Sequence, residues 1–297
     1  MNSSIQQDTL WRRVAIAMPY IWLLVFFLTP FAIILKISLA DPALAQPPYT
    51  PMIDSRGDIN ITFDNFVFLL TDKLYALTYL RSLLLAASAT IFALLLGFPM
   101  AYGISRASAA TRSLLLLLIV LPFWISFLLR VYAWMGLMNN YGVINNALMW
   151  LGFIDQPMQI MYTDFAVLVG LTYSYLPFMV LPLYATLEKL DLDLVEAAQD
   201  LGASSTRAFW DVTWPLARPG VIAGCLLVFI PATGEYVIPY LLGGPNSMLI
   251  GRVLFEEFFA NRDWPLASAV AIVMLLLLIA PIMLLQHYRM REKEQAA

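Results

Sequence analysis

Six runs of about twenty apolar residues constrain the fold of this chain more than any other feature of its sequence. A helix rises about 1.5 Å per residue, so roughly twenty residues cross the hydrocarbon core of a bilayer. Hydrophobic residues make up 61% of the 297 and charged residues 12%, which is too little charge to cover a soluble domain of this size. We therefore predict an all-α membrane protein with a single transmembrane domain over residues 1–297. Its six helices are expected at about 14–36, 79–104, 114–136, 164–187, 219–241 and 266–287.

The first apolar run resembles a secretory signal, because Arg12 and Arg13 precede it. It is, however, longer than the apolar part of a signal peptide, and it continues through Pro30 without a small-residue cleavage site. We therefore expect an uncleaved membrane helix. Prolines inside the predicted spans should bend several of the helices. These prolines are Pro99, Pro122, Pro177, Pro182, Pro231, Pro239 and Pro281.

Basic residues predict the orientation of the chain, since cytoplasmic loops are enriched in lysine and arginine. Ten of the seventeen lie in one set of segments. They are Arg12, Arg13, Arg106, Arg112, Lys189, Arg207, Arg218, Arg289, Arg291 and Lys293. Both termini and the 188–218 loop are therefore predicted to be cytoplasmic. The opposite loops, about 37–78, 137–163 and 242–265, carry more acids than bases, which favours the approach of a cationic solute over a short, salt-screened range.

The cytoplasmic 188–218 loop carries the pattern of two short helices. Leu194, Ala197, Ala198 and Leu201 recur at helical spacing and form one apolar stripe. Asp193 is expected to cap the first helix in a capping box with Glu196, and Gly202 to end it in a left-handed conformation. Ser204 or Ser205 should cap a second helix through about Val212, which Pro215 ends before the fifth span.

Two interpretations of this loop are open from its residues alone. It is either a capped helical connector, in which Glu196 is only a capping residue, or a docking element for a partner. Alanines allow a partner backbone to approach closely, and the loop is longer than a connection between two spans requires. These two observations favour docking.

The loop also resembles a known family. Glu-Ala-Ala, three residues, Gly, nine residues, Ile, one residue and Leu-Pro is the cytoplasmic signature of permease subunits of binding-protein-dependent ABC importers. The matching residues are Glu196, Ala197, Ala198, Gly202 and Pro215, while Val212 and Trp214 replace the Ile and Leu with other apolar residues. Over nearly the whole chain the resemblance narrows to the polyamine group, most closely to putrescine importer permeases. The segments that carry it are 19–22, 36–40, 130–136, 234–239 and 261–265.

The resemblance implies a type I importer permease and several partners. In that family the Glu-Ala-Ala helix sits in a groove of an ATP-binding subunit, and that subunit dimer holds ATP and Mg²⁺. A second, different permease and a periplasmic polyamine-binding protein complete the transporter. This chain has no phosphate-binding G-x-x-x-x-G-K-[ST] segment of its own, so we expect a non-catalytic subunit without a cofactor. No nucleic-acid partner is expected.

Two charged residues lie inside predicted spans, where charges are costly and commonly functional. Glu235 lies near the outer end of the fifth span. We hypothesise that it contacts a polyamine in transit, because carboxylates and aromatic faces both attract ammonium groups. The tyrosines that can assist it are Tyr236, Tyr240, Tyr173 and Tyr175. The alternative role for Glu235 is a hydrogen bond between helices that fixes their packing.

Arg130 is the second charged residue, late in the third span. We expect it to reach the outer interface or to form a structural ion pair. A metal site is not predicted, since Cys225 is the only cysteine and His287 has no companion ligand at metal-binding spacing.

The expected function is ATP-driven import of putrescine across a bacterial inner membrane. The nearest alternative is the same kind of importer for spermidine or another small organic cation. A channel or secondary carrier that uses Glu235 as a proton relay would need no ATP, but it would leave the cytoplasmic loop unexplained. An assembly scaffold would have no need for a carboxylate in the membrane.

Overall fold

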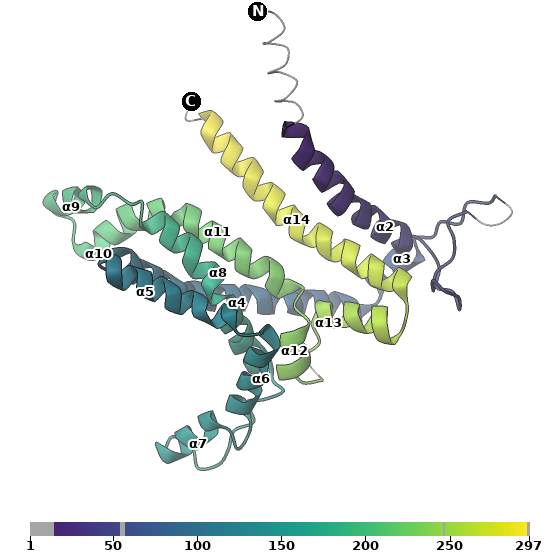
Figure 1. The fold of residues 1–297 in the computed structure, drawn as a ribbon, viewed down its shortest axis with the longest axis horizontal. Coiled ribbons are helices and arrows are strands. Elements are labelled where there is room, and N and C mark those ends of the chain that lie inside the picture. Colours follow the sequence, from purple (N-terminus) through teal and green to yellow (C-terminus); the bar gives the residue numbers. More distant parts are fainter. Residues whose placement is uncertain (1–14, 54–56, 246, 296–297) are drawn as a thin grey trace, which may run out of the picture. The chain divides into compact units, whose positions relative to one another are not determined.

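The computed structural model describes residues 15–53, 57–245 and 247–295, and this part of the chain is helical with no β-strand (Figure 1). The all-α class predicted above is confirmed. The chain divides into two compact units. Unit 1 combines Met1–Ala76 with Leu254–Ala297, and unit 2 is Leu77–Val253.

Unit 1 is built on two long helices that lie side by side (Figure 1). The first helix, Ala15–Ser38, includes a wide turn at η1 (Leu24–Leu28) and continues as α2 (Thr29–Ser38). It packs along α14 (Trp264–Gln295), which also contacts α3 (Asp64–Thr71). The amide of Asn65 donates to the carbonyls of Ser38 and Ala40, at 3.1 and 2.9 Å, and so ties α3 to the end of α2. The unit also includes the wide turn η4 (Glu256–Ala260).

Unit 2 contains most of α4 (Lys73–Arg106) and the helices that follow it as far as Val253. These begin with α5 (Ala109–Val120), the short η2 (Leu121–Trp124), α6 (Phe127–Met138), α7 (Val143–Trp150) and α8 (Asp164–Leu187). They continue with α9 (Asp193–Asp200), α10 (Ser205–Ala208), η3 (Phe209–Thr213), α11 (Trp214–Thr233) and α12 (Val237–Leu242). The last, α13 (Ile250–Phe255), runs past the end of the unit. Helix α7 lies within the 137–163 loop.

The core of unit 2 lies between α8 and α11, which pack along each other. Twelve of the 24 residues of α8 are buried, including Met179 and Leu183. Glycines on α11 allow the close approach, since a Cβ at Gly224 would lie 2.7 Å from the sulfur of Met179, and one at Gly220 would lie 2.6 Å from the hydroxyl of Thr186. These helices therefore form a fixed pair, as small residues commonly allow in membrane proteins.

Four helices in the described part of the chain are long and apolar enough to cross a membrane. They are Ala15–Ser38, Lys73–Arg106, Asp164–Leu187 and Ser205–Thr233. They correspond to the first, second, fourth and fifth predicted spans. The sixth falls on α14, where the apolar segment Trp264–Ile279 is shorter and most side chains beyond it lie outside those described. The count of six therefore stays a prediction.

The third predicted span, 114–136, is not one straight helix. The segments Ala109–Trp124 and Phe127–Trp150 meet at a bend of 92°. Pro122 lies at the start of the tight turn η2, and Ile125 and Ser126 are extended. Because proline removes a helical hydrogen bond and crowds the preceding turn, the helix breaks here. Pro99, Pro177 and Pro182 lie inside helices that remain continuous.

The fifth predicted span, 219–241, is interrupted near its end. Helix α11 stops at Thr233, and α12 begins at Val237. Gly234, Glu235 and Tyr236 lie between them. Glu235 is therefore on a break between two helices, and the continuous helix predicted there is wrong.

Candidate functional site

The predicted docking loop folds into α9 and α10, at one end of unit 2 in Figure 1. Helix α9 covers the Glu-Ala-Ala segment as predicted, but the capping box is wrong. The helix begins at Asp193 itself, and the side chain of Asp191 accepts from the Asp193 N–H at 3.1 Å. In the predicted capping box, the Glu196 side chain accepts from the Asp193 N–H. Asp191 accepts this hydrogen bond instead, and Asp193 lies in the first turn of the helix.

Gly202 ends α9 in the left-handed conformation that was predicted, with φ of +89°. Its N–H donates to the Gln199 carbonyl at 2.8 Å, and the Ala203 N–H donates to the Ala198 carbonyl at 3.0 Å. This pair of bonds is the Schellman motif, which satisfies carbonyls at a helix end. The predicted cap of the next helix is confirmed as well, since the Ser204 hydroxyl accepts from the Arg207 N–H at 3.3 Å.

Pro215 does not end the second helix, contrary to prediction. The helix runs without a stop from Ser205 to Thr233. Its turn at Phe209–Thr213 is a wide, π-helical one, and Pro215 follows in the first turn of α11. A wide turn moves the preceding carbonyls away from the proline ring, so the helix passes through without the usual clash. The docking loop is therefore joined directly to a long helix of the core.

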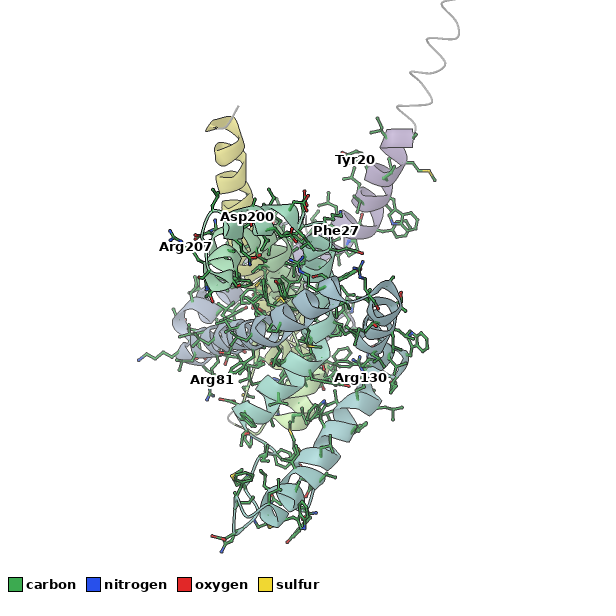
Figure 2. The ribbon with its side chains drawn as sticks, turned by 90° about the vertical axis from the view of Figure 1, so that its left-hand side faces the viewer. Tyr20, Phe27, Arg81, Arg130, Asp200 and Arg207 are labelled. Carbon is green, nitrogen blue, oxygen red and sulfur yellow. The ribbon has the colours of Figure 1, made fainter. Side chains whose placement is uncertain are left out.

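Most of α9 is open to its surroundings. None of its residues is buried, and Glu196 and Ala197 are exposed. The apolar stripe remains uncovered, with Leu194 50% and Leu201 91% exposed. Asp200 and Arg207 mark α9 and α10 in Figure 2, away from Arg130 in the same unit. The stripe is thus available to a partner.

Aromatic rings connect the helix after the loop to α4. The Phe209 ring meets the edge of Phe98 at 5.7 Å between centroids, and Trp214 lies 5.5 Å from the same ring. At the start of the loop, just after α8, Glu188 pairs with Arg112 of α5 at 2.8 Å, and Arg112 also donates to the carbonyl of Ser105 on α4. Both ends of the loop are therefore held by contacts with neighbouring helices.

Glu235 joins three elements of unit 2. One carboxylate oxygen accepts from the Val237 N–H at 2.9 Å and so caps α12. The other oxygen accepts a short hydrogen bond from the hydroxyl of Tyr175 on α8. The backbone of the break is also packed closely, because a Cβ at Gly251 would lie 2.7 Å from the Glu235 carbonyl. This arrangement places a half-buried carboxylate between α8 and α12, while the backbone of Glu235 lies against α13.

Of the four tyrosines predicted to assist Glu235, Tyr175 donates a hydrogen bond to its carboxylate. The rings of Tyr236 and Tyr240 pack against each other at an angle of 32°, with 5.2 Å between their centroids. The Arg252 guanidinium lies 5.5 Å from the Tyr240 ring centre. Tyr173 lies about 200° around α8 from Tyr175 and packs on Trp134 at 5.2 Å.

Arg130 does not form the ion pair expected from the sequence. It is 8% exposed, and none of the described carboxylates is within ion-pair distance. The guanidinium instead faces the rings of Phe123 and Phe127, 4.9 and 5.5 Å from their centres. Phe127 lies three residues before Arg130 on the same face of α6, and Phe123 approaches from the other side of the sharp bend.

Sequence reasoning missed two anchors near the break. The Ser82 hydroxyl on α4 accepts from the Ile250 N–H at 2.7 Å, at the start of α13. Asp164, the first residue of α8, accepts from the Ser247 hydroxyl at 2.6 Å and lies 3.6 Å from Arg81. Both fix the segment between α12 and α13. Their sequence signal is weak, since Ser82 lies inside α4 without a distinctive pattern, and an aspartate such as Asp164 is common at a helix start.

The sequence was also compared with known families and known proteins. Residues 89–291 match the family described as "Binding-protein-dependent transport system inner membrane component". The "Spermidine/putrescine transport system permease protein PotB" of Escherichia coli (strain K12) is 45% identical over 228 residues, 77% of this chain and 82% of that protein. The protein with the same description from Haemophilus influenzae is 38% identical over 278 residues, 94% of this chain and 93% of its own length.

A solved structure shares the fold. It is a bacterial ABC transporter involved in the import of the acidic polysaccharide alginate, with a TM-score of 0.72 and 19% identity over 97% of this chain and 98% of that one. The type I importer permease fold predicted above is confirmed. The chain belongs to the family of binding-protein-dependent transport system inner membrane components, which are non-catalytic membrane subunits of ABC transporters.

Proposed function

We propose that this chain is one membrane subunit of an ATP-driven importer that moves a polyamine, most closely putrescine, into the cytoplasm. The family description supports an importer permease, and the names of the PotB relatives support the polyamine class. A second, different permease, an ATP-binding subunit dimer and a periplasmic polyamine-binding protein complete the transporter. The multi-pass chain lies in the bacterial inner membrane, with both termini in the cytoplasm.

The observation that carries the mechanism is the exposed stripe of α9 on a loop continuous with α11. The ATP-binding subunit receives Glu196, Ala197 and Ala198 in its groove. Gly202 and Pro215 set where α9 ends and the next helix continues. The helix Ser205–Thr233 has 29 residues, so it carries movement of the loop over roughly 43 Å. ATP and Mg²⁺ act on the partner subunit.

Glu235 lies directly after the far end of that helix. In the proposed cycle, an ammonium group of the polyamine displaces the Tyr175 hydroxyl from the carboxylate, and the faces of Tyr236 and Tyr240 contact the cation. Tyr173 belongs to the same proposed pathway from the other side of α8. The alternative role, a hydrogen bond that only holds α8 and α12 together, is supported by the same contacts. The two roles predict different effects of Tyr175→Phe and Glu235→Gln on uptake.

Reconstitution tests the proposal. The chain, its second permease and the binding protein are placed in proteoliposomes with and without the ATP-binding subunit, and uptake of labelled putrescine and spermidine is measured. Uptake should require ATP and the ATP-binding subunit, and Glu196→Lys should abolish it. Uptake by the chain alone without ATP would favour a channel or secondary carrier and overturn the proposal. A preference for spermidine would correct the substrate and leave the mechanism intact.

A further inference from the structure

A cavity of about 420 Å³ lies within unit 2, between α4, α5, α6 and α8. Its walls are almost entirely apolar. They include Pro99, Gly103, Leu118, Pro122, Leu176 and Pro177. Arg130 is the one charged side chain among the lining residues, and Tyr173 adds a hydroxyl. This volume falls in the range of cavities that hold small organic ligands.

Arg130 lacks a counter-charge among the described residues. More than nine-tenths of it is buried, and its Nε is buried without a hydrogen-bond partner. Two phenylalanine rings cover its guanidinium, and they attract the cation without neutralising it. A buried charge left unpaired is costly, so an external anion has a strong reason to bind here.

The lining determines what kind of anion fits. A small hydrophilic anion would lose its water and find a single cation in return. A polyamine would be repelled by Arg130 and would find no carboxylate in the lining. A molecule with one negatively charged head and a hydrocarbon chain satisfies both the arginine and the apolar walls.

We propose that this cavity binds an anionic lipid. Its charged oxygen, from the phosphate of a phospholipid or the carboxylate of a fatty acid, pairs with Arg130, and its acyl chain lies against Gly103 and Leu118. The site is separate from Glu235, and it shares Tyr173 with the proposed polyamine pathway. Bound lipid would also hold the ring of Phe123, which packs edge-on against Phe178 at 5.3 Å.

Two glycines provide a matched pair of variants. A Cβ at Gly103 meets no atom within 4 Å, so a leucine there enters the cavity while Arg130 stays in place. Gly136 on α6 is equally open and is not part of the lining, so Gly136→Leu adds the same bulk elsewhere. Arg130→Gln removes the charge, and Arg207→Gln removes an exposed arginine as its control.

Native mass spectrometry tests the proposal on the full chain, purified in a mild detergent that retains associated subunits. The probes are phosphatidylglycerol, oleate and the zwitterionic phosphatidylcholine, and thermal unfolding checks that each variant is folded. We expect one phosphatidylglycerol or oleate per chain, with affinity reduced roughly tenfold or more by Arg130→Gln and by Gly103→Leu. Gly136→Leu and Arg207→Gln should change it by less than about twofold.

The two anionic probes identify the source of the charge, since one offers a phosphate and the other a carboxylate. Binding that the two cavity variants do not weaken would overturn the proposal. So would equal binding of phosphatidylcholine. Absence of bound lipid from the wild-type complex would also overturn it and would indicate that an associated subunit neutralises Arg130.

Discussion

The pair Tyr175 and Glu235 allows a substrate role to be separated from a packing role. Tyr175→Phe removes the hydroxyl that donates to the carboxylate and leaves the charge of Glu235 in place. Glu235→Gln removes the charge but keeps one oxygen as an acceptor. That single oxygen can serve either the Tyr175 hydroxyl or the Val237 N–H, which the carboxylate now accepts with separate oxygens.

The structure sets the size of each effect. Hydrogen bonds between membrane helices contribute about 0.6 kcal/mol on average and up to about 1.7 kcal/mol, and an ionised acceptor is at the strong end. Tyr175→Phe should therefore cost about 1 kcal/mol of stability. Glu235→Gln should cost about 1–2 kcal/mol, since one buried donor loses its partner. An ammonium about 4 Å from a carboxylate gains up to about 4 kcal/mol at an effective dielectric constant near 20, so loss of the charge should lower uptake at least about tenfold.

Two measurements on the same samples distinguish the roles. Thermal unfolding in detergent reports stability, and ATP-driven uptake of labelled putrescine into proteoliposomes reports function. If Glu235 meets the substrate, Tyr175→Phe should keep uptake within about threefold of wild type, because it frees the oxygen that the ammonium needs. Equal losses of uptake in the two variants, in proportion to their losses of stability, would refute the substrate role and leave Glu235 as a packing residue.

Three further outcomes are expected. Gly202→Ala should destabilise the end of α9 by about 1–2 kcal/mol, because an L-residue is strained at a φ of +89°; hydrogen exchange at the Ala203 amide should rise, and unchanged exchange would contradict the Schellman geometry. Gly224→Val should cost about 1–3 kcal/mol by overpacking against the sulfur of Met179; a lower midpoint of thermal unfolding checks it, and a wild-type midpoint would show that α8 and α11 separate easily. Leu201→Ser should leave that midpoint unchanged, since the side chain is 91% exposed, but it should weaken co-purification of the ATP-binding subunit; undiminished co-purification would remove the apolar stripe from the docking surface.

Local chemistry made the docking loop predictable. The glycine stop at Gly202 and the serine cap at Ser204 depend on a few neighbouring residues, and both are confirmed. The same local reasoning was wrong at Asp193, because Asp191 offers an equivalent carboxylate two residues earlier. It was also wrong at Pro215, because the wide turn before this proline lets the helix continue past it.

The membrane part was predictable in outline only. Apolar length locates the spans, but it cannot say where a span breaks. Pro122 indicated a bend before α6. The break at Glu235, in contrast, involves contacts with Gly251 and Tyr175, which are distant from it or on another helix and give no local signal. The contact of Arg130 with Phe123 could not be predicted either, since that ring lies on the other side of the 92° bend.

The wide turn at Phe209–Thr213 has a geometrical consequence for the whole loop. It holds one residue more than an ordinary helical turn, and each residue of a helix advances the direction of the side chains by about 100°. The wide turn therefore takes up its extra residue locally and keeps the angular phase between the docking loop and α11. Removing one residue from this turn would give an ordinary turn and leave the apolar stripe of α9 aimed as it is, whereas removing one residue from the α-helical turns of α11 would rotate the stripe by about 100°, roughly a quarter of a turn.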